Sequence, residues 1–240
     1  MTELEYLKKY LHPEDSLEEA LERLKNGEPL QYIVGDTDFF GSTFKVNKNV
    51  LIPRPETEEL VEYTLQLVKN IFPKKNLCIL DIGTGSGCIP ITLKKQIPSA
   101  NVNAVDISKE ALNVAKENAI LNNVEVNFIE SNIFSNVKGN YDLIISNPPY
   151  IREDEPIMDI VKNNEPHLAL YAPNNGLYFY EAITSSAHNY LNDKFIIAYE
   201  IGEEQGLEVV SIAEKYFPNA KVILKKDIRG FDRFVFIIQE

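Results

Sequence analysis

The sequence has few of the residues that build metal sites or disulfide frameworks. Its 240 residues include only two cysteines and three histidines. The histidines are scattered, and Cys78 and Cys88 lack the spacing of metal ligands. Two thiols also make no disulfide framework. We therefore expect no metal site, and we expect both cysteines to be small buried residues in or beside a glycine-rich turn.

Long apolar runs are also missing. No stretch approaches the roughly 18 apolar residues that indicate a transmembrane helix. The N-terminus, MTELEYLKKYLHPEDSLEE, is charged and has no apolar signal-peptide core. We expect a cytoplasmic protein that makes no contact with a membrane.

Basic residues are scarce relative to acidic ones. The chain has 24 Lys and Arg against 36 Asp and Glu, a formal net charge of −12. Sequence-independent binding to nucleic acid depends on neutralising phosphates with Lys and Arg, so we expect no direct nucleic-acid binding, although a local basic patch is compatible with this balance. The charge fits a protein partner or a small-molecule substrate better.

The pattern along the chain predicts three parts. Residues 1–26 form a short helical segment, with Ser16 as a helix N-cap and a glycine at its end. Residues 27–56 form a β-hairpin linker from the stretches QYIVG, DFFGSTFKVN and VLIP, with Gly41-Ser42 at its turn. Residues 57–240 form the main domain, which opens with an amphipathic helix in ETEELVEYTLQLVKNI.

From residue 77 onwards, short apolar strands alternate with helical stretches. The predicted strands are LCILDIG, NVNAVDIS, VEVNFIE, YDLIIS and KFIIAYEIG, and the stretches AKVILKKDIRG and RFVFIIQE close the chain as a hairpin. Buried strands that are each followed by a helix predict an α/β fold with a mostly parallel sheet covered on both faces. An antiparallel final hairpin is compatible with such a sheet.

A glycine-rich loop, LDIGTGSG, follows the first of these strands and opens a helix. A dinucleotide fingerprint would need glycine at position 88, and there is no Lys-Ser/Thr for a P-loop. Asp106 ends the next strand, where a carboxylate can bind two ribose hydroxyls. We expect a ligand with an adenosine-type ribose and no pyrophosphate. The alternatives are that the glycines form only a tight turn, and that Asp81 is a turn residue, braces the loop or binds an amine.

The stretch SNPPY leaves the strand YDLIIS at the edge where ligands of such sheets bind. A planar amide or an aromatic amine is a poor nucleophile, and two acceptors could orient its –NH₂ group: the side-chain oxygen of Asn147 and the carbonyl of Pro148. Proline holds that carbonyl rigidly, and the ring of Tyr150 could lie against the flat substrate group. The geometry would suit in-line attack by the oriented nitrogen, with no obvious general base. The alternative is a strand terminator with a packed tyrosine.

Together these features resemble class I S-adenosylmethionine-dependent methyltransferases, and NPPY resembles the [DN]-P-P-[YFW] signature of amino-group methyltransferases. That resemblance implies a Rossmann-like fold with a seven-stranded, mostly parallel sheet and an antiparallel C-terminal hairpin. The motif leaves adenine N6, guanine N2 and glutamine N5 open as acceptors.

The stretch around LIPRPETE, with EPHLAL, NGLYFY and YEIGEEQG, resembles the HemK/PrmC family. The resemblance covers nearly the whole chain and implies methyl transfer from S-adenosyl-L-methionine to the glutamine of the GGQ tripeptide in bacterial class 1 peptide chain release factors. Carried over by position, it implies the following contacts: Asp81, Gly83, Thr84, Gly85, Ser86 and Gly87 for the methionine part of the cofactor, Asp106 for the ribose, Ile133 for the adenine, and Asn147, Pro148, Pro149 and Tyr150 for the glutamine side chain. Asn147, Pro148 and Tyr150 are then the catalytic candidates, with Asn147 also beside the cofactor.

The chain departs from the family pattern in two places. It has Asn132-Ile133 where the family often has Asp-Trp or Asp-Leu, and its N-terminal helical segment is short. The expected partner is a release factor bound by a monomer. The alternative substrates for the same chemistry are a glutamine of a ribosomal protein and a nucleic-acid base. The alternative functions are a non-catalytic scaffold and a nucleotide-linked dehydrogenase. Arg54 and its neighbours Pro53, Pro55 and Glu56 suit a rigid linker with a helix N-cap at least as well as catalysis.

Overall fold

A computed structural model describes residues 2–73 and 76–240. Met1 of the predicted N-terminal segment and residues 74–75 of the predicted main domain lie outside the described residues. The strands are β1 (Asp36–Phe39), β2 (Ser42–Lys45), β3 (Cys78–Ile82), β4 (Asn101–Asp106), β5 (Asn127–Glu130), β6 (Tyr141–Ser146), β7 (Leu191–Glu200), β8 (Lys221–Lys226) and β9 (Asp232–Gln239). The helices are α1 (Glu3–Tyr10), α2 (Leu17–Lys25), α3 (Leu30–Val34), α4 (Pro55–Ile71), α5 (Cys88–Gln96), α6 (Lys109–Leu121), α7 (Asp159–Asn164), α8 (His167–Leu170), α9 (Tyr178–Ala187), the 3₁₀ turn η1 (His188–Tyr190) and α10 (Gly206–Tyr216).

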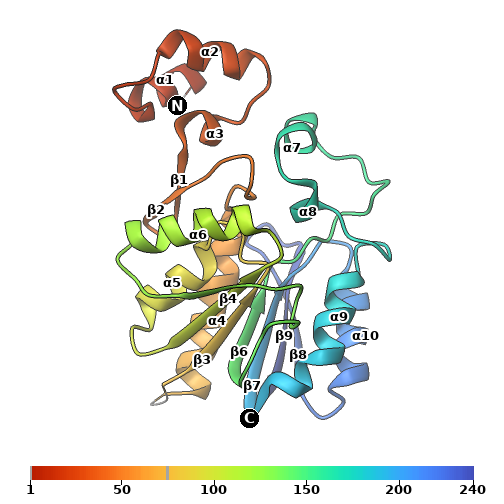
Figure 1. Ribbon diagram of the computed structural model, residues 1–240. Coiled ribbons are helices and arrows are strands. Elements are labelled where there is room, and N and C mark those ends of the chain that lie inside the picture. Colours follow the sequence, from red (N-terminus) through yellow and green to blue (C-terminus); the bar gives the residue numbers. More distant parts are fainter. Residues whose placement is uncertain (1, 74–75) are drawn as a thin grey trace.

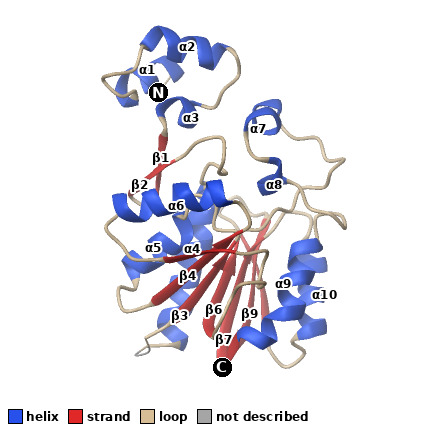
Figure 2. Cartoon of the chain, viewed as in Figure 1, coloured by secondary structure: helices blue, strands red, loops and turns tan. Residues whose placement is uncertain are grey.

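The main sheet has seven strands in the order β5-β4-β3-β6-β7-β9-β8. Figure 2 draws the strands in red. The pairs from β5 to β7 are parallel, and β9 runs antiparallel to both of its neighbours. The predicted α/β fold with a mostly parallel sheet and an antiparallel C-terminal hairpin is therefore confirmed.

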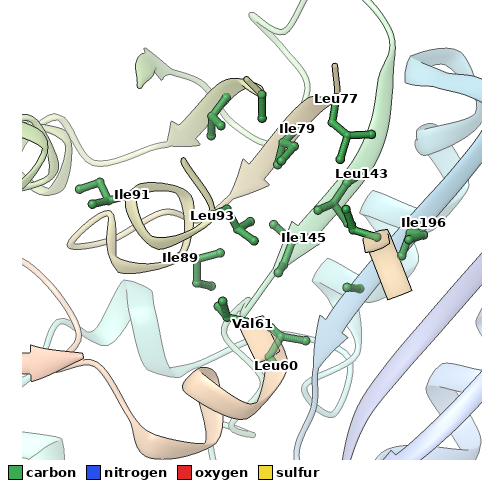
Figure 3. Close-up of a cluster of buried hydrophobic side chains, with 14 of the residues drawn as sticks. Leu60, Val61, Leu77, Ile79, Ile89, Ile91, Leu93, Leu143, Ile145 and Ile196 are labelled. Carbon is green, nitrogen blue, oxygen red and sulfur yellow. The ribbon is translucent and has the colours of Figure 1, made fainter. Parts of the chain in front are cut away.

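Helices cover both faces of this sheet (Figure 1). One apolar cluster joins the sheet to α4 and α5, and Figure 3 shows part of it, including Leu60, Ile91 and Ile145. These three side chains are fully buried, and each contributes roughly 1.5–3 kcal/mol of hydrophobic stabilisation. A second cluster joins the opposite face to α9 and α10. The two cores hold the strand ends in fixed positions.

The first 35 residues carry a small core of their own. Leu7, Ala20, Ile33 and Val34 bring α1, α2 and α3 together. The predicted N-cap of α2 is present, because the Ser16 hydroxyl accepts the Glu19 N–H. Figure 1 shows this unit, with α1 and α2 at the top, separated from the main sheet by the β1-β2 hairpin.

The linker differs from its prediction at both ends. QYIV is the helix α3 rather than a strand, because its residues are bounded by Pro29 at the N-cap and by Gly35, which ends the helix at a φ of 91°. The turn is Phe40-Gly41, one residue earlier than predicted, since Phe39 pairs with Ser42. The stretch VLIP is not a strand.

Both cysteines were predicted to be buried. The prediction is confirmed for Cys88 and wrong for Cys78, which is only partly buried.

Candidate functional site

The carboxyl ends of β3, β4 and β6 meet at one edge of the sheet. The strand order reverses direction between β3 and β6, which makes this the switch point where parallel sheets bind ligands. A cavity of about 330 Å³ lies here, within the usual range for small-molecule sites. The structure places nine of the predicted site residues in its lining: Gly83, Thr84, Gly85, Ser86, Asp106, Ile133, Asn147, Pro148 and Pro149.

Three predicted residues lie outside this lining. Tyr150 lines an adjoining cavity of about 90 Å³, which shares Asn147 and Pro148 with the larger one. Gly87 sits at the start of α5, and a Cβ there would lie 3.0 Å from the Cβ of Ala115 in α6. It therefore allows two helices to pack closely. Asp81 is fully buried near the end of β3.

Asp106 is held by the backbone around it. One carboxylate oxygen accepts the Gly85 N–H and the other accepts the Ser108 N–H, both at 2.9 Å. Burial raises the pKa of this carboxyl, and the backbone hydrogen bonds oppose that rise. Each carboxylate oxygen has a second lone pair. Asp106 can thus brace the glycine loop and still accept two hydroxyl hydrogens from a ligand in the cavity.

Asp81 is different, because its charge has little compensation. Neither carboxylate oxygen has a hydrogen bond of good geometry to any described residue. Burial raises the pKa of Asp81 to about 7, and the nearby Thr84 hydroxyl moderates this rise. A buried carboxyl without hydrogen bonds is costly in the free protein. The next two residues, Ile82 and Gly83, line the cavity, so Asp81 lies directly beside the cavity lining along the chain.

The segment after β5 supplies Ser131, Asn132 and Ile133 to the lining of the cavity. Ile133 lies in this lining with a φ of 50°, a left-handed conformation that is uncommon for a β-branched residue. The Ser131 hydroxyl donates to the Ile133 carbonyl at 2.9 Å and so helps to hold this conformation.

Asn147 belongs to a hydrogen-bond chain that the sequence did not predict. Its side-chain nitrogen donates to the Thr57 hydroxyl at 3.1 Å. That hydroxyl donates to a Glu200 carboxylate oxygen at 2.7 Å. Glu200 ends β7, and burial raises its pKa to about 7.

Tyr150 is wedged between two glycine-containing segments. Gln205 donates to the Tyr150 carbonyl at 3.0 Å. A Cβ at Gly176 would lie 2.0 Å from that same carbonyl oxygen, so only glycine allows this approach. A Cβ at Gly202 would lie 3.3 Å from the tyrosine ring. The stretches NGLYFY and YEIGEEQG are therefore packed against NPPY, and burial raises the pKa of the Tyr150 hydroxyl.

Arg54, which lines both cavities, is paired with the buried Glu165. The Arg54 guanidinium donates to Glu165 at 2.5 Å, and the Ile52 N–H donates to the other Glu165 oxygen at 3.1 Å. Glu165 is only 4% exposed. The pair ties the end of the linker to the segment between β6 and α9. This contact gives Arg54 a structural role in the linker, which is one of the two roles considered for it from the sequence.

Sequence reasoning missed Thr57, Glu165 and Glu200 as parts of the site. A signal for Glu200 was present, because a glutamate ends the apolar run FIIAYE beside the strand that leads to Asn147. Nothing in the pattern indicated Thr57, since it lies on a different element from both of its hydrogen-bond partners.

Comparison with known proteins bears directly on this arrangement. A protein-family model described as the methyltransferase small domain matches residues 59–211. The release factor glutamine methyltransferase of Flavobacterium psychrophilum is 49% identical over 224 residues, which cover 91% of this chain and 78% of that protein. The protein of the same name from Streptococcus pneumoniae is 45% identical, covering 92% of this chain and 78% of its own length.

This chain belongs to the release factor glutamine methyltransferase family. Among solved structures, a release factor-specific protein-(glutamine-N5) methyltransferase from Alicyclobacillus acidocaldarius is 27% identical, with a TM-score of 0.51, and the match covers 82% of this chain and 99% of the other. A methyltransferase from Pyrococcus furiosus has a TM-score of 0.60 at 18% identity and shows the shared fold. The resemblance to the HemK/PrmC family is confirmed.

The site of this family member fits S-adenosylmethionine. Asp106 has lone pairs that could accept its ribose hydroxyls, and the oxygens of Asp81, which have no hydrogen-bond partner among the described residues, are a candidate partner for the cationic amine of its methionine part. Among the described residues, no group of His, Cys, Asp and Glu could hold a metal ion. No helix within residues 2–73 and 76–240 is long and apolar enough to cross a membrane.

Proposed function

We propose that this chain transfers a methyl group from S-adenosylmethionine to the side-chain nitrogen, N5, of the glutamine in the GGQ tripeptide of a bacterial class 1 release factor. The observation that carries this proposal is that a single cavity is lined both by the glycine loop with Asp106 and by Asn147 with Pro148. A methyl donor and an amide acceptor can therefore meet in one enclosed volume. The names of the relatives support the choice of substrate.

On the cofactor side, we propose that Asp106 holds the ribose and Ile133 flanks the adenine. The methionine part would lie along the glycine loop, with Asp81 facing its amine. The loop residues concerned are Gly83, Thr84, Gly85, Ser86 and Gly87. When bound, S-adenosylmethionine supplies an electrophilic methyl group on a positively charged sulfur.

On the substrate side, we propose that Asn147 and Pro148 accept the two hydrogens of the glutamine –NH₂ group. Pro149 keeps the chain rigid, and the Tyr150 ring forms a wall of the amide pocket. An amide nitrogen is a weak nucleophile, so the contribution of these residues is orientation and exclusion of water. The closed Arg54–Glu165 pair forms part of that enclosure.

We propose that the three parts predicted from the sequence divide between recognition of the release factor and methyl transfer. Residues 1–26 and the linker 27–56 would contact the protein substrate, and residues 57–240 would carry out the transfer. We further propose that the protein acts as a monomer in the cytoplasm and contacts neither membrane nor nucleic acid directly.

The proposal is tested with purified protein, a class 1 release factor and radiolabelled S-adenosylmethionine. We expect one methyl group on the GGQ glutamine, located by mass spectrometry. A release factor with GGE in place of GGQ is the matched control and should take up no label. Labelling of a ribosomal protein or a nucleic acid instead, with none on the release factor, would contradict the substrate that we propose.

A further inference from the structure

We propose that Thr57 and Glu200 are positioning residues that fix which end of the Asn147 amide faces the substrate. The proposal rests on the function above and adds two residues to it. Its basis is the continuous hydrogen-bond chain from Asn147 through Thr57 to Glu200.

The direction of each hydrogen bond follows from chemistry. An ionised carboxylate only accepts hydrogen bonds. The one hydrogen of the Thr57 hydroxyl must therefore point to Glu200, at 2.7 Å. The lone pairs of that hydroxyl remain, and they can be met only by a donor. Asn147 must turn its –NH₂ end towards Thr57, at 3.1 Å, so its oxygen faces the other way.

The oxygen is the end that the reaction needs. A substrate –NH₂ group is a double donor, and Asn147 lines both cavities of the site. With its oxygen towards the substrate, Asn147 accepts a hydrogen from the glutamine amide. With the amide reversed, two –NH₂ groups would face each other. The hydrogen-bond chain therefore selects an acceptor over a donor at the point of reaction.

The sheet register places Glu200 where it can do this. Ser146 of β6 pairs with Tyr199 of β7 in parallel register, so Asn147 and Glu200 are the next residues along neighbouring strands. Glu200 is 2% exposed and Thr57 is 3% exposed. Burial of both groups excludes competing water. Burial raises the pKa of Glu200, and Glu56 adds to this rise, whereas the Thr57 hydrogen bond and the positive charges of Arg233 and Arg54 oppose it.

The same helix provides a matched control for Thr57. Thr64 lies seven residues further along α4 and is also fully buried, but its hydroxyl has no hydrogen-bond partner among the described residues. Replacing either threonine by valine removes one hydroxyl and keeps the branched shape. The two variants therefore differ mainly in whether a hydrogen-bond chain is broken.

The experiment compares the full-length wild type with Thr57→Val, Thr57→Ser and Thr64→Val at pH 8, above the raised pKa of Glu200. We expect Thr57→Val to lower kcat for methylation of the release factor by roughly 10- to 100-fold, with little change in S-adenosylhomocysteine binding by calorimetry. Thr57→Ser retains the hydroxyl and should restore most of kcat. Thr64→Val should match the wild type in both measurements.

A second measurement is independent of activity. In ¹⁵N–¹H NMR spectra of the free protein, the side-chain NH₂ signals of Asn147 should move and exchange faster in Thr57→Val, and remain in place in Thr64→Val. Unchanged Asn147 signals in Thr57→Val would overturn the positioning role even if the proposed substrate were wrong. A kcat for Thr57→Val equal to that of the wild type, in an enzyme that methylates the release factor, would also overturn it.

Discussion

Asp81 and Glu200 are two buried carboxyls near the ends of strands in one sheet, and each has a pKa raised to about 7 by burial. They differ in their partners. Glu200 accepts a hydrogen bond from Thr57, whereas neither oxygen of Asp81 has a well-formed hydrogen bond among the described residues. The proposed substrate half of the site thus has its buried carboxylate hydrogen-bonded in the free protein, whereas the proposed cofactor half holds a carboxyl whose oxygens have no such partner among the described residues. Preorganisation is concentrated where orientation matters most.

The largest expected effect comes from breaking the substrate half. Asn147→Ala removes the acceptor for the substrate amide, and we expect kcat to fall roughly 100- to 1000-fold, as for the loss of one preorganised catalytic hydrogen-bonding group. S-adenosylhomocysteine should bind nearly as well as to the wild type. Single-turnover methylation and calorimetry measure the two quantities. Retention of full activity would remove Asn147 from the proposed mechanism.

A smaller effect is expected from the cofactor half. Asp81→Asn keeps the shape of the side chain and removes its charge. A hydrogen bond to a charged group contributes about 1.5–3 kcal/mol, so we expect the dissociation constant of S-adenosylhomocysteine to rise about tenfold to a hundredfold. At saturating cofactor, kcat should change little. An unchanged dissociation constant would assign Asp81 to bracing of the loop, which is the other role considered from the sequence.

The smallest expected effect is in the pH dependence of stability. A carboxyl whose folded pKa lies above its ordinary value binds more protons when folded, so the free energy of unfolding falls as pH rises from about 4 to about 7. Asp81 and Glu200 both contribute in this window. We expect Tm of the free protein to fall over this range. In Asp81→Asn the fall should be smaller, by roughly 2–4 °C for each kcal/mol of pH-dependent unfolding free energy that the substitution removes.

Thermal unfolding between pH 5 and pH 8, followed by circular dichroism, measures this difference. Saturating S-adenosylhomocysteine should reduce the pH dependence of the wild type, because the bound amine compensates Asp81, and should leave the Glu200 contribution in place. Identical pH profiles for the wild type and Asp81→Asn would contradict the uncompensated state of Asp81.

Most of the fold could be predicted because it depends on local patterns. Alternating apolar strands and helices predict the parallel sheet, and strand ends place Asp106 and Asn147 at one edge. The helix α3 was missed because a five-residue apolar stretch is too short to reveal its period. Whether it forms a helix depends on the core that it shares with α1 and α2.

The candidate site could be predicted only in part. The glycine loop and NPPY are contiguous in sequence, so their chemistry is visible there. Thr57 and Glu200 are 143 residues apart, and no local pattern indicates that a helix start and a strand end will meet. The hydrogen bond between Asn147 and Thr57 depends in the same way on packing between distant elements.

Glu165 joins segments that are otherwise remote. It accepts hydrogen bonds from Ile52 and Arg54, and its neighbour Asn164 donates to the Gly27 carbonyl at 2.8 Å. One buried carboxylate thus couples the linker to the segment between β6 and α9. Opening either segment would separate Glu165 from Ile52 and Arg54 and leave its carboxylate without these partners. The two segments should therefore open together as one cooperative unit. Amide hydrogen exchange would then slow in both at once when a protein substrate binds to either.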